Sequence, residues 1–213
     1  MSAAIDRRFL SLALSLGRRG QGSTWPNPAV GCVIVKGGRI LGRGWTAPGG
    51  RPHAEPQALA QAGAAARGAT AYVSLEPCSH HGQTPPCTDA LIAAGIARVV
   101  APIADTDPRV SGQGFDRLRA AGIAVTTGLS VAEAERDHAG FFVRNETGRP
   151  FVTLKLASSF DGRIATASGE SRWITGPEAR RAVHAMRHRH DAVMVGAGTA
   201  RADDPGLTVR DMG

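Results

Sequence analysis

The chain has 213 residues, of which 42% are hydrophobic and 20% charged, a composition typical of a soluble globular protein with enough apolar material for a core. The three cysteines are too few, and odd in number, for a disulfide framework, so we expect a reducing compartment and a cytoplasmic protein. A formal net charge of +7 favours anionic partners such as phosphates or nucleic acid, although a solvated arginine-rich surface explains it equally well. No apolar stretch is long enough to span a membrane, so we expect no membrane partner.

The first part of the chain alternates predicted helices and strands. The first helix is amphipathic and ends at Gly17. Its apolar face is predicted to hold Ile5, Phe9, Leu12, Ala13 and Leu16. Further strands are expected at residues 29–36, 39–46, 69–75, 98–101 and 123–126, and further helices at 53–65, 87–94, 115–121 and 131–142. Gly37 and Gly38 form the turn of a hairpin between the first two strands.

A polar stretch with Gly148 and Pro150 indicates a linker, and a second domain is predicted after it. It has predicted strands at 151–157, 191–195 and 207–210, a helix at 177–189 and a short helix after Gly196. Three strands are too few to close a nucleotide-binding sheet, so we expect this domain to be truncated. The predicted boundary separates residues 1–145 from residues 146–213. Because strands alternate with helices, the first domain is predicted to be a three-layer α/β/α domain.

Four residues of the first domain form a pattern that indicates a catalytic metal site. His53 and Glu55 stand two residues apart, and Cys78, which follows a proline, and Cys87 come later. This order resembles the H-x-E…P-C-x-x-C signature of zinc-dependent nucleobase deaminases, with eight residues in place of two between the cysteines. Zinc prefers nitrogen and thiolate ligands, and a catalytic site keeps one position open for water. The pattern therefore predicts His53, Cys78 and Cys87 as ligands of one Zn²⁺, with Glu55 as the catalytic proton carrier.

Other interpretations of these residues stay open at this point. A purely structural zinc site would need a fourth ligand, which His80 or His81 could supply. A deaminase acting on nucleic acid or on a free nucleobase is the second alternative, and the basic charge fits the first of these. The long loop between the cysteines and the attached second domain argue against a nucleic-acid substrate, so we expect no nucleic-acid partner.

Several longer runs resemble one family, the bifunctional deaminase-reductases of riboflavin biosynthesis. The runs are PNPAVGCVIV at 26–35, HAE at 53–55, YVSLEPCSHHG at 72–82, TPPC at 84–87, LKLASSFDGR at 154–163 and ADDPGLTVR at 202–210. The wide spacing between the cysteines is normal for this family. The resemblance implies a cytidine-deaminase-like domain followed by an incomplete dihydrofolate-reductase-like α/β domain.

The resemblance also implies substrates and cofactors. The first domain would deaminate 2,5-diamino-6-ribosylamino-4(3H)-pyrimidinone 5′-phosphate, and the second would reduce the ribosyl group of the product with NADPH. Because the second domain looks incomplete, we expect this chain not to perform the reduction. The resemblance places Asn27, His80, Asp105 and Asp107 at the deaminase substrate. Gln83 stands where relatives often have a basic residue, which leaves the phosphate to His81 or to an arginine.

In the second domain the resemblance assigns two groups of residues. Those aligned with nucleotide contacts are Ala157, Trp173, Thr199 and Asp203. Those aligned with contacts to the reductase substrate are Lys155, Ser171, Arg187, Leu207 and Arg210. Such deaminase domains often pair, so we also expect a homo-oligomer.

Overall fold

The structure of the protein is a computed structural model that describes residues 2–212. It forms two compact units, the first ending at Phe151 and the second beginning at Val152.

The first unit is built on a five-stranded sheet with the strand order β2-β1-β3-β4-β5. The strands are β1 (Gly31–Lys36), β2 (Arg39–Trp45), β3 (Thr70–Val73), β4 (Arg98–Val100) and β5 (Ala124–Thr126). The predicted hairpin is present, and β1 pairs antiparallel with both β2 and β3. The β3–β4 and β4–β5 pairs are parallel, so the ends of β3 and β4 lie at the same edge of the sheet.

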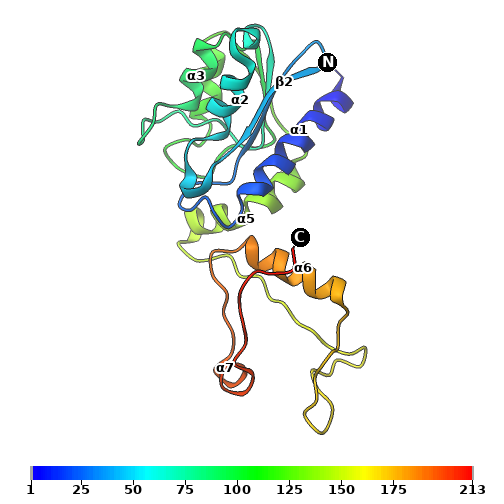
Figure 1. Cartoon of the computed structure of the whole chain (residues 1–213). Helices are drawn as coiled ribbons and strands as arrows, with labels where there is room; N and C mark the ends of the chain where they lie inside the picture. Colours follow the sequence, from blue (N-terminus) through cyan, green and yellow to red (C-terminus); the bar gives the residue numbers. More distant parts are fainter. Residues whose placement is uncertain (1, 213) are drawn as a thin grey trace. The chain divides into compact units, whose positions relative to one another are not determined.

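Helices cover both faces of this sheet (Figure 1). They are α1 (Ala3–Gly17) and α5 (Val131–Thr147) on one face, and α2 (Ala54–Ala62), α3 (Cys87–Ala93) and α4 (Gln113–Ala120) on the other. Three short 3-10 helices, η1 (Arg18–Gly20), η2 (Pro48–Gly50) and η3 (Gly63–Ala66), complete the connections. Strand β1 is buried on both sides: Cys32 and Ile34 pack toward α2, whereas Val33 and Val35 pack toward α1. The predicted three-layer α/β/α architecture is therefore confirmed.

The buried face of α1 differs from the predicted one. Leu10 and Leu14 are almost fully buried, whereas Ile5 is 42% exposed. Asp6 is also buried, because its carboxylate accepts hydrogen bonds from Tyr72 in β3 and Arg98 in β4. Hydrophobicity alone does not predict this orientation of α1, because the buried ion pair between Asp6 and Arg98 also helps to determine which face packs against the sheet.

Two glycines let α2 lie close against β2. A Cβ on Gly42 would lie 2.0 Å from the carbonyl oxygen of Ala58, and one on Gly44 would lie 2.5 Å from that of Ala54. Both distances are far below van der Waals contact, so only glycine permits this approach. The first turn of α2 is thereby fixed against the sheet.

The second unit contains two helices, α6 (Pro177–His188) and α7 (Ala197–Asp203), joined by extended segments. The predicted strands at 151–157, 191–195 and 207–210 are wrong as strands, because no ladder forms among the described residues of this unit. A strand needs a hydrogen-bonded neighbour, and Val152, Leu154 and Leu156 remain more than 70% exposed. The predicted helices of the second unit are present in the structure, whereas its predicted strands are not.

Helix α5 runs past position 145 to Thr147, and the predicted boundary between residues 145 and 146 stays a prediction. Among residues 2–212, no helix is both long and apolar enough to cross a membrane.

Candidate active site

The predicted site residues of the first unit converge on a cavity of about 450 Å³. Its lining includes Asn27, His53, Glu55, Cys78, His80, Asp105 and Asp107. The ends of β3 and β4 and the first turn of α2 supply most of them, as expected for an α/β sheet whose parallel strands end at one edge. Seven of the eight deaminase residues predicted from the sequence therefore line one cavity, and the eighth, Cys87, lies beside it.

His53, Cys78 and Cys87 form a compact cluster of donor atoms. All of these atoms lie within 4.8 Å of one another. His53 Nδ1 is 3.3 Å from Cys87 Sγ and 3.7 Å from Cys78 Sγ. One imidazole nitrogen and two sulfurs fit the ligand preference of Zn²⁺, and three protein ligands leave a fourth position for a reactant. Neither His80 nor His81 belongs to the cluster, so a fourth protein ligand from this loop is not in place among the described residues.

The electrostatics of the cluster favour a thiolate at Cys78. The pKa of Cys78 is lowered to about 4, first by a hydrogen bond from the Cys87 side chain and further by His53 and the Cys87 backbone N–H. That N–H, the first of α3, lies 3.3 Å from Cys78 Sγ. The pKa of Cys87 is raised well above its ordinary value by the Cys78 sulfur and by burial, so the thiol proton stays on Cys87. The pKa of His53 is raised, chiefly by its hydrogen bond to Cys78.

Glu55 is buried beside the cluster, with 3% of its surface exposed. It lies in the first turn of α2, two residues after the N-cap residue His53, which points both side chains toward the cavity. Burial is the main cause that raises the pKa of the Glu55 carboxyl. A carboxyl whose pKa is raised holds a proton more readily, which suits a group that must both accept and return one.

Asn27 and His80 contribute polar groups to the cavity wall. The Asn27 amide nitrogen donates to the Gly50 carbonyl oxygen at 2.8 Å, which fixes the amide. Gly50 has a φ of +83°, and a Cβ there would lie 2.8 Å from that same nitrogen, so the contact requires glycine. His80 Nδ1 is buried and has no hydrogen-bond partner among the described residues. A buried nitrogen of this kind calls for a partner that a ligand can supply.

Asp105 and Asp107 lie on the loop after β4 and have opposite environments. Burial raises the pKa of Asp105 to about 6. The Asp105 carboxylate accepts the backbone N–H of Asp107 at 2.8 Å. Arg109 pairs with Asp107 at 2.6 Å and lowers the pKa of that carboxyl. The loop therefore presents one carboxyl that readily holds a proton and one that stays ionised.

The cavity also contains residues that the sequence did not single out. They are the arginines Arg51, Arg109 and Arg144, the aromatic Phe141 and the buried carboxylate Glu76. Phe141 and Arg144 come from α5, and no motif in the sequence connects that helix with the metal cluster. Glu76 could have been found from the sequence, because it directly precedes the Pro-Cys pair that contains a predicted zinc ligand.

The predicted reductase residues all lie in the second unit, mostly at exposed positions. Trp173 is 71% exposed and stacks with Arg180 at 4.4 Å. Arg187 and Arg210 both donate to the carbonyl oxygen of Gly206, the residue before Leu207. Thr199 and Asp203 both lie in α7, whereas Ala157 lies in the extended segment that opens this unit. These side chains are mostly exposed and do not enclose a dinucleotide.

Comparison with known proteins places the first unit in the class of cytidine-type zinc deaminases. Residues 3–103 match the family described as "Cytidine and deoxycytidylate deaminase zinc-binding region". That match contains His53, Glu55, Cys78 and Cys87, the same four residues that converge in the structure.

Over nearly its whole length the chain is similar to the riboflavin biosynthesis proteins RibD. Residues 150–213 match the RibD C-terminal domain. Riboflavin biosynthesis protein RibD of Escherichia coli is 56% identical over 96% of this chain, and that of Aquifex aeolicus is 50% identical over 99% of it. The aligned parts make up 56% and 59% of these relatives, so the chain spans little more than half of their length.

Two solved structures show the same similarity. RibD of Acinetobacter baumannii superimposes with a TM-score of 0.89 at 48% identity, over 99% of this chain and 59% of that one. The Thermotoga maritima protein, described as a diaminohydroxyphosphoribosylaminopyrimidine deaminase and 5-amino-6-(5-phosphoribosylamino)uracil reductase, has a TM-score of 0.92 at 44% identity, over 98% of this chain and 60% of that one.

Proposed function

We propose that the first unit is a zinc-dependent deaminase of riboflavin biosynthesis. Its substrate is 2,5-diamino-6-ribosylamino-4(3H)-pyrimidinone 5′-phosphate, which reacts with water to give 5-amino-6-(5-phosphoribosylamino)uracil and ammonia. The observation that carries the proposal is the buried Glu55 carboxyl beside the His53, Cys78 and Cys87 cluster on one cavity. The relatives named above, with the activity stated for the Thermotoga protein, supply the substrate class.

The metal ligands and the proton carrier have separate roles in the proposed reaction. His53, Cys78 and Cys87 hold Zn²⁺, which when bound supplies the Lewis acidity that makes an attacking water more acidic. Glu55 accepts a proton from that water and returns protons to the ring nitrogen and to the departing amino group. Its burial keeps bulk water from competing for the proton.

The remaining polar residues orient the pyrimidine. Asn27, fixed by Gly50, presents its amide oxygen to the donor edge of the ring. The unpartnered His80 Nδ1 finds its hydrogen-bond partner in the substrate. Asp105 and Asp107 bind the ribose hydroxyls, which can donate to carboxylate oxygens.

Ammonia release by the zinc-loaded chain, given the phosphorylated diaminopyrimidine, tests this proposal. Glu55→Gln is expected to abolish release while retaining one zinc per chain. Glu135→Gln, which changes an exposed acid on α5, is the matched control and is expected to behave as the wild type. A structural metal site makes the opposite prediction, because Glu55→Gln would then leave every measured property unchanged.

For the second unit we propose a contribution to NADPH-dependent reduction of the ribosyl group, with residues 1–145 as the deaminase domain and 146–213 as part of the reductase domain. Ala157, Trp173, Thr199 and Asp203 are proposed nucleotide contacts. Lys155, Ser171, Arg187, Leu207 and Arg210 are proposed contacts of the sugar phosphate. Titration of the chain with NADPH, followed by the fluorescence of Trp173 against a Trp173→Phe control, tests the nucleotide assignment.

Three further expectations are part of the proposal. A homo-oligomer predicts a mass in light scattering that is a multiple of the chain's 22.1 kDa. The absence of a nucleic-acid partner predicts that polynucleotide binds weakly and does not inhibit deamination. The cytoplasmic location predicts that the protein fractionates with soluble cytoplasmic enzymes.

A further inference from the structure

Three arginines line the cavity, and they differ in how their charge is compensated. Arg109 forms an ion pair with Asp107 at 2.6 Å. Arg144 lies over the ring of Phe141 and donates to the neutral Asn145 amide. Arg51 has no carboxylate partner among the described residues and contacts the Thr84 hydroxyl and the His53 imidazole. Arg51 and Arg144 therefore bring positive charge to the cavity without a carboxylate partner in the described part of the chain.

Arg51 is held in position from the loop between the two cysteines. Its Nη1 donates to Thr84 Oγ1 at 2.7 Å. Its Nη2 would lie 3.4 Å from a Cβ on Gly82, so the guanidinium rests against the loop at a residue without a side chain. In the described residues Nη1 alone of its nitrogens makes hydrogen bonds, which leaves Nε and Nη2 available as donors. A half-buried guanidinium with free donors is an anion-binding group.

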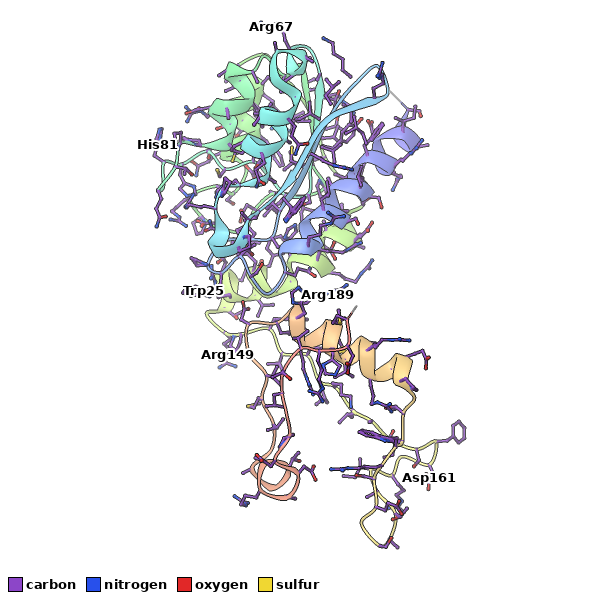
Figure 2. All side chains as sticks on the ribbon, viewed as in Figure 1. Trp25, Arg67, His81, Arg149, Asp161 and Arg189 are labelled. Carbon is purple, nitrogen blue, oxygen red and sulfur yellow. The ribbon has the colours of Figure 1, made fainter. Side chains whose placement is uncertain are left out.

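The neighbouring loop residues cannot supply this charge. Gln83 lines the cavity with a neutral amide. His81 is exposed and lies at the outer edge of the loop (Figure 2). On the loop side of the cavity, Arg51 is thus the cation nearest to Gly82 and Thr84.

We propose that Arg51, oriented by Thr84, binds the phosphate monoester of the substrate at the mouth of the deaminase cavity. This inference rests on the proposed function, because it assigns the phosphate of that substrate. A guanidinium can bind two phosphate oxygens through parallel N–H groups, and a charge-assisted pair of this kind is stronger than a neutral hydrogen bond. Thr84 acts as a positioning residue, since its hydroxyl accepts from the same nitrogen that would otherwise be free to turn away.

The test compares the phosphorylated substrate with its dephosphorylated ribosyl analogue. Arg51→Gln is expected to lower kcat/KM for the phosphorylated compound by about 10- to 100-fold, chiefly through KM, and to change it less than twofold for the analogue. Arg51→Lys keeps the positive charge but loses the paired N–H donors of the guanidinium. Its kcat/KM for the phosphorylated compound is expected to lie between those of the wild type and Arg51→Gln. Gln83→Lys in the Arg51→Gln background adds a cation on the same wall and is expected to restore part of the loss.

Arg109→Gln is the matched control, because Arg109 lines the same cavity but is already paired with Asp107. An equal loss on both substrates, a loss of zinc in Arg51→Gln, or a phosphate-specific loss in Arg109→Gln instead would overturn the assignment. Calorimetric binding of ribose 5-phosphate to the zinc-loaded protein separates this inference from the proposed function. Affinity that falls in Arg51→Gln supports the anion site even if no ammonia is released, and unchanged affinity contradicts it.

Discussion

The carboxylate of Glu76 accepts the backbone N–H of Asp105 at 3.0 Å, and this bond joins the two loops that flank the cavity. The same carboxylate accepts the N–H groups of Gly112 at 2.9 Å and Gly114 at 2.8 Å, where α4 begins. Glu76 stands two residues before the zinc-ligand candidate Cys78, so one buried side chain ties the metal loop to the loop that carries Asp105. A carboxylate can accept several N–H groups at once, whereas an amide offers one acceptor and would turn donors toward donors.

Glu76→Gln is therefore expected to lower the free energy of unfolding by about 2 kcal/mol, because a buried N–H loses its acceptor. Urea unfolding measures this change, with the exposed Glu146→Gln as control. In the folded fraction, KM is expected to rise more than kcat falls, since the Asp105 loop loses its anchor while Glu55 is untouched. A variant as stable as the wild type would show that the Asp105 loop does not depend on this carboxylate.

The buried Asp6 predicts a pH-dependent contribution to stability. Its hydrogen bond with Arg98 is the main cause that lowers the Asp6 pKa in the folded protein. The stabilisation is therefore fully present above the unfolded pKa of about 4 and is lost as the pH falls through the lower folded pKa. Asp6→Asn is expected to cost about 2 kcal/mol at pH 7 and progressively less below pH 4, measured by urea unfolding across this range. Asp116→Asn, at an exposed ion pair, should cost little at any pH, and a constant cost for Asp6→Asn would contradict the linkage.

The close approach of α2 to β2 predicts a steric effect at Gly44. A methyl group there would meet the Ala54 carbonyl oxygen at 2.5 Å, so Gly44→Ala must displace the turn that carries His53 and Glu55. The expected cost is about 1–3 kcal/mol of stability together with weaker zinc binding. Gly140→Ala in α5 is the control: its nearest neighbour would lie 3.9 Å away, and helix propensity predicts a gain of up to about 1 kcal/mol. Thermal unfolding with and without zinc compares the two, and equal effects would rule out the packing argument.

Substitution of the three cysteines is expected to affect zinc binding unequally. Cys78→Ala and Cys87→Ala are expected to lose tight zinc binding, whereas Cys32→Ala keeps one zinc per chain because Cys32 lies in the core. Zinc at 1,000 times its dissociation constant stabilises the wild type by about 4 kcal/mol, and the two ligand variants should lack this shift. Elemental analysis and thermal unfolding supply the two measurements. Zinc uptake by Cys78→Ala equal to that of the wild type would contradict the ligand assignment.

The sequence predicted the helices and strands of the first unit, and seven of the residues that it singled out line one cavity. It did so because H-x-E and Pro-Cys encode ligand chemistry, and because β1 and β3 are continuous apolar runs. It did not predict Phe141 and Arg144, since they reach the cavity through the packing of α5, which no local pattern specifies. The predicted strand at 151–157 was wrong for a related reason: its apolar residues have strand propensity, but pairing depends on a neighbour.

The two cysteines of the candidate metal cluster are 9 residues apart and stand at the two ends of one loop. With both ends fixed at the metal, this loop can change its sequence without moving the atoms that perform the chemistry. Arg51 reaches this loop from a neighbouring segment, where it donates to Thr84 and places a positive charge beside the neutral Gln83. The cation at the mouth of the cavity is therefore carried by a segment outside the loop that the two cysteines enclose.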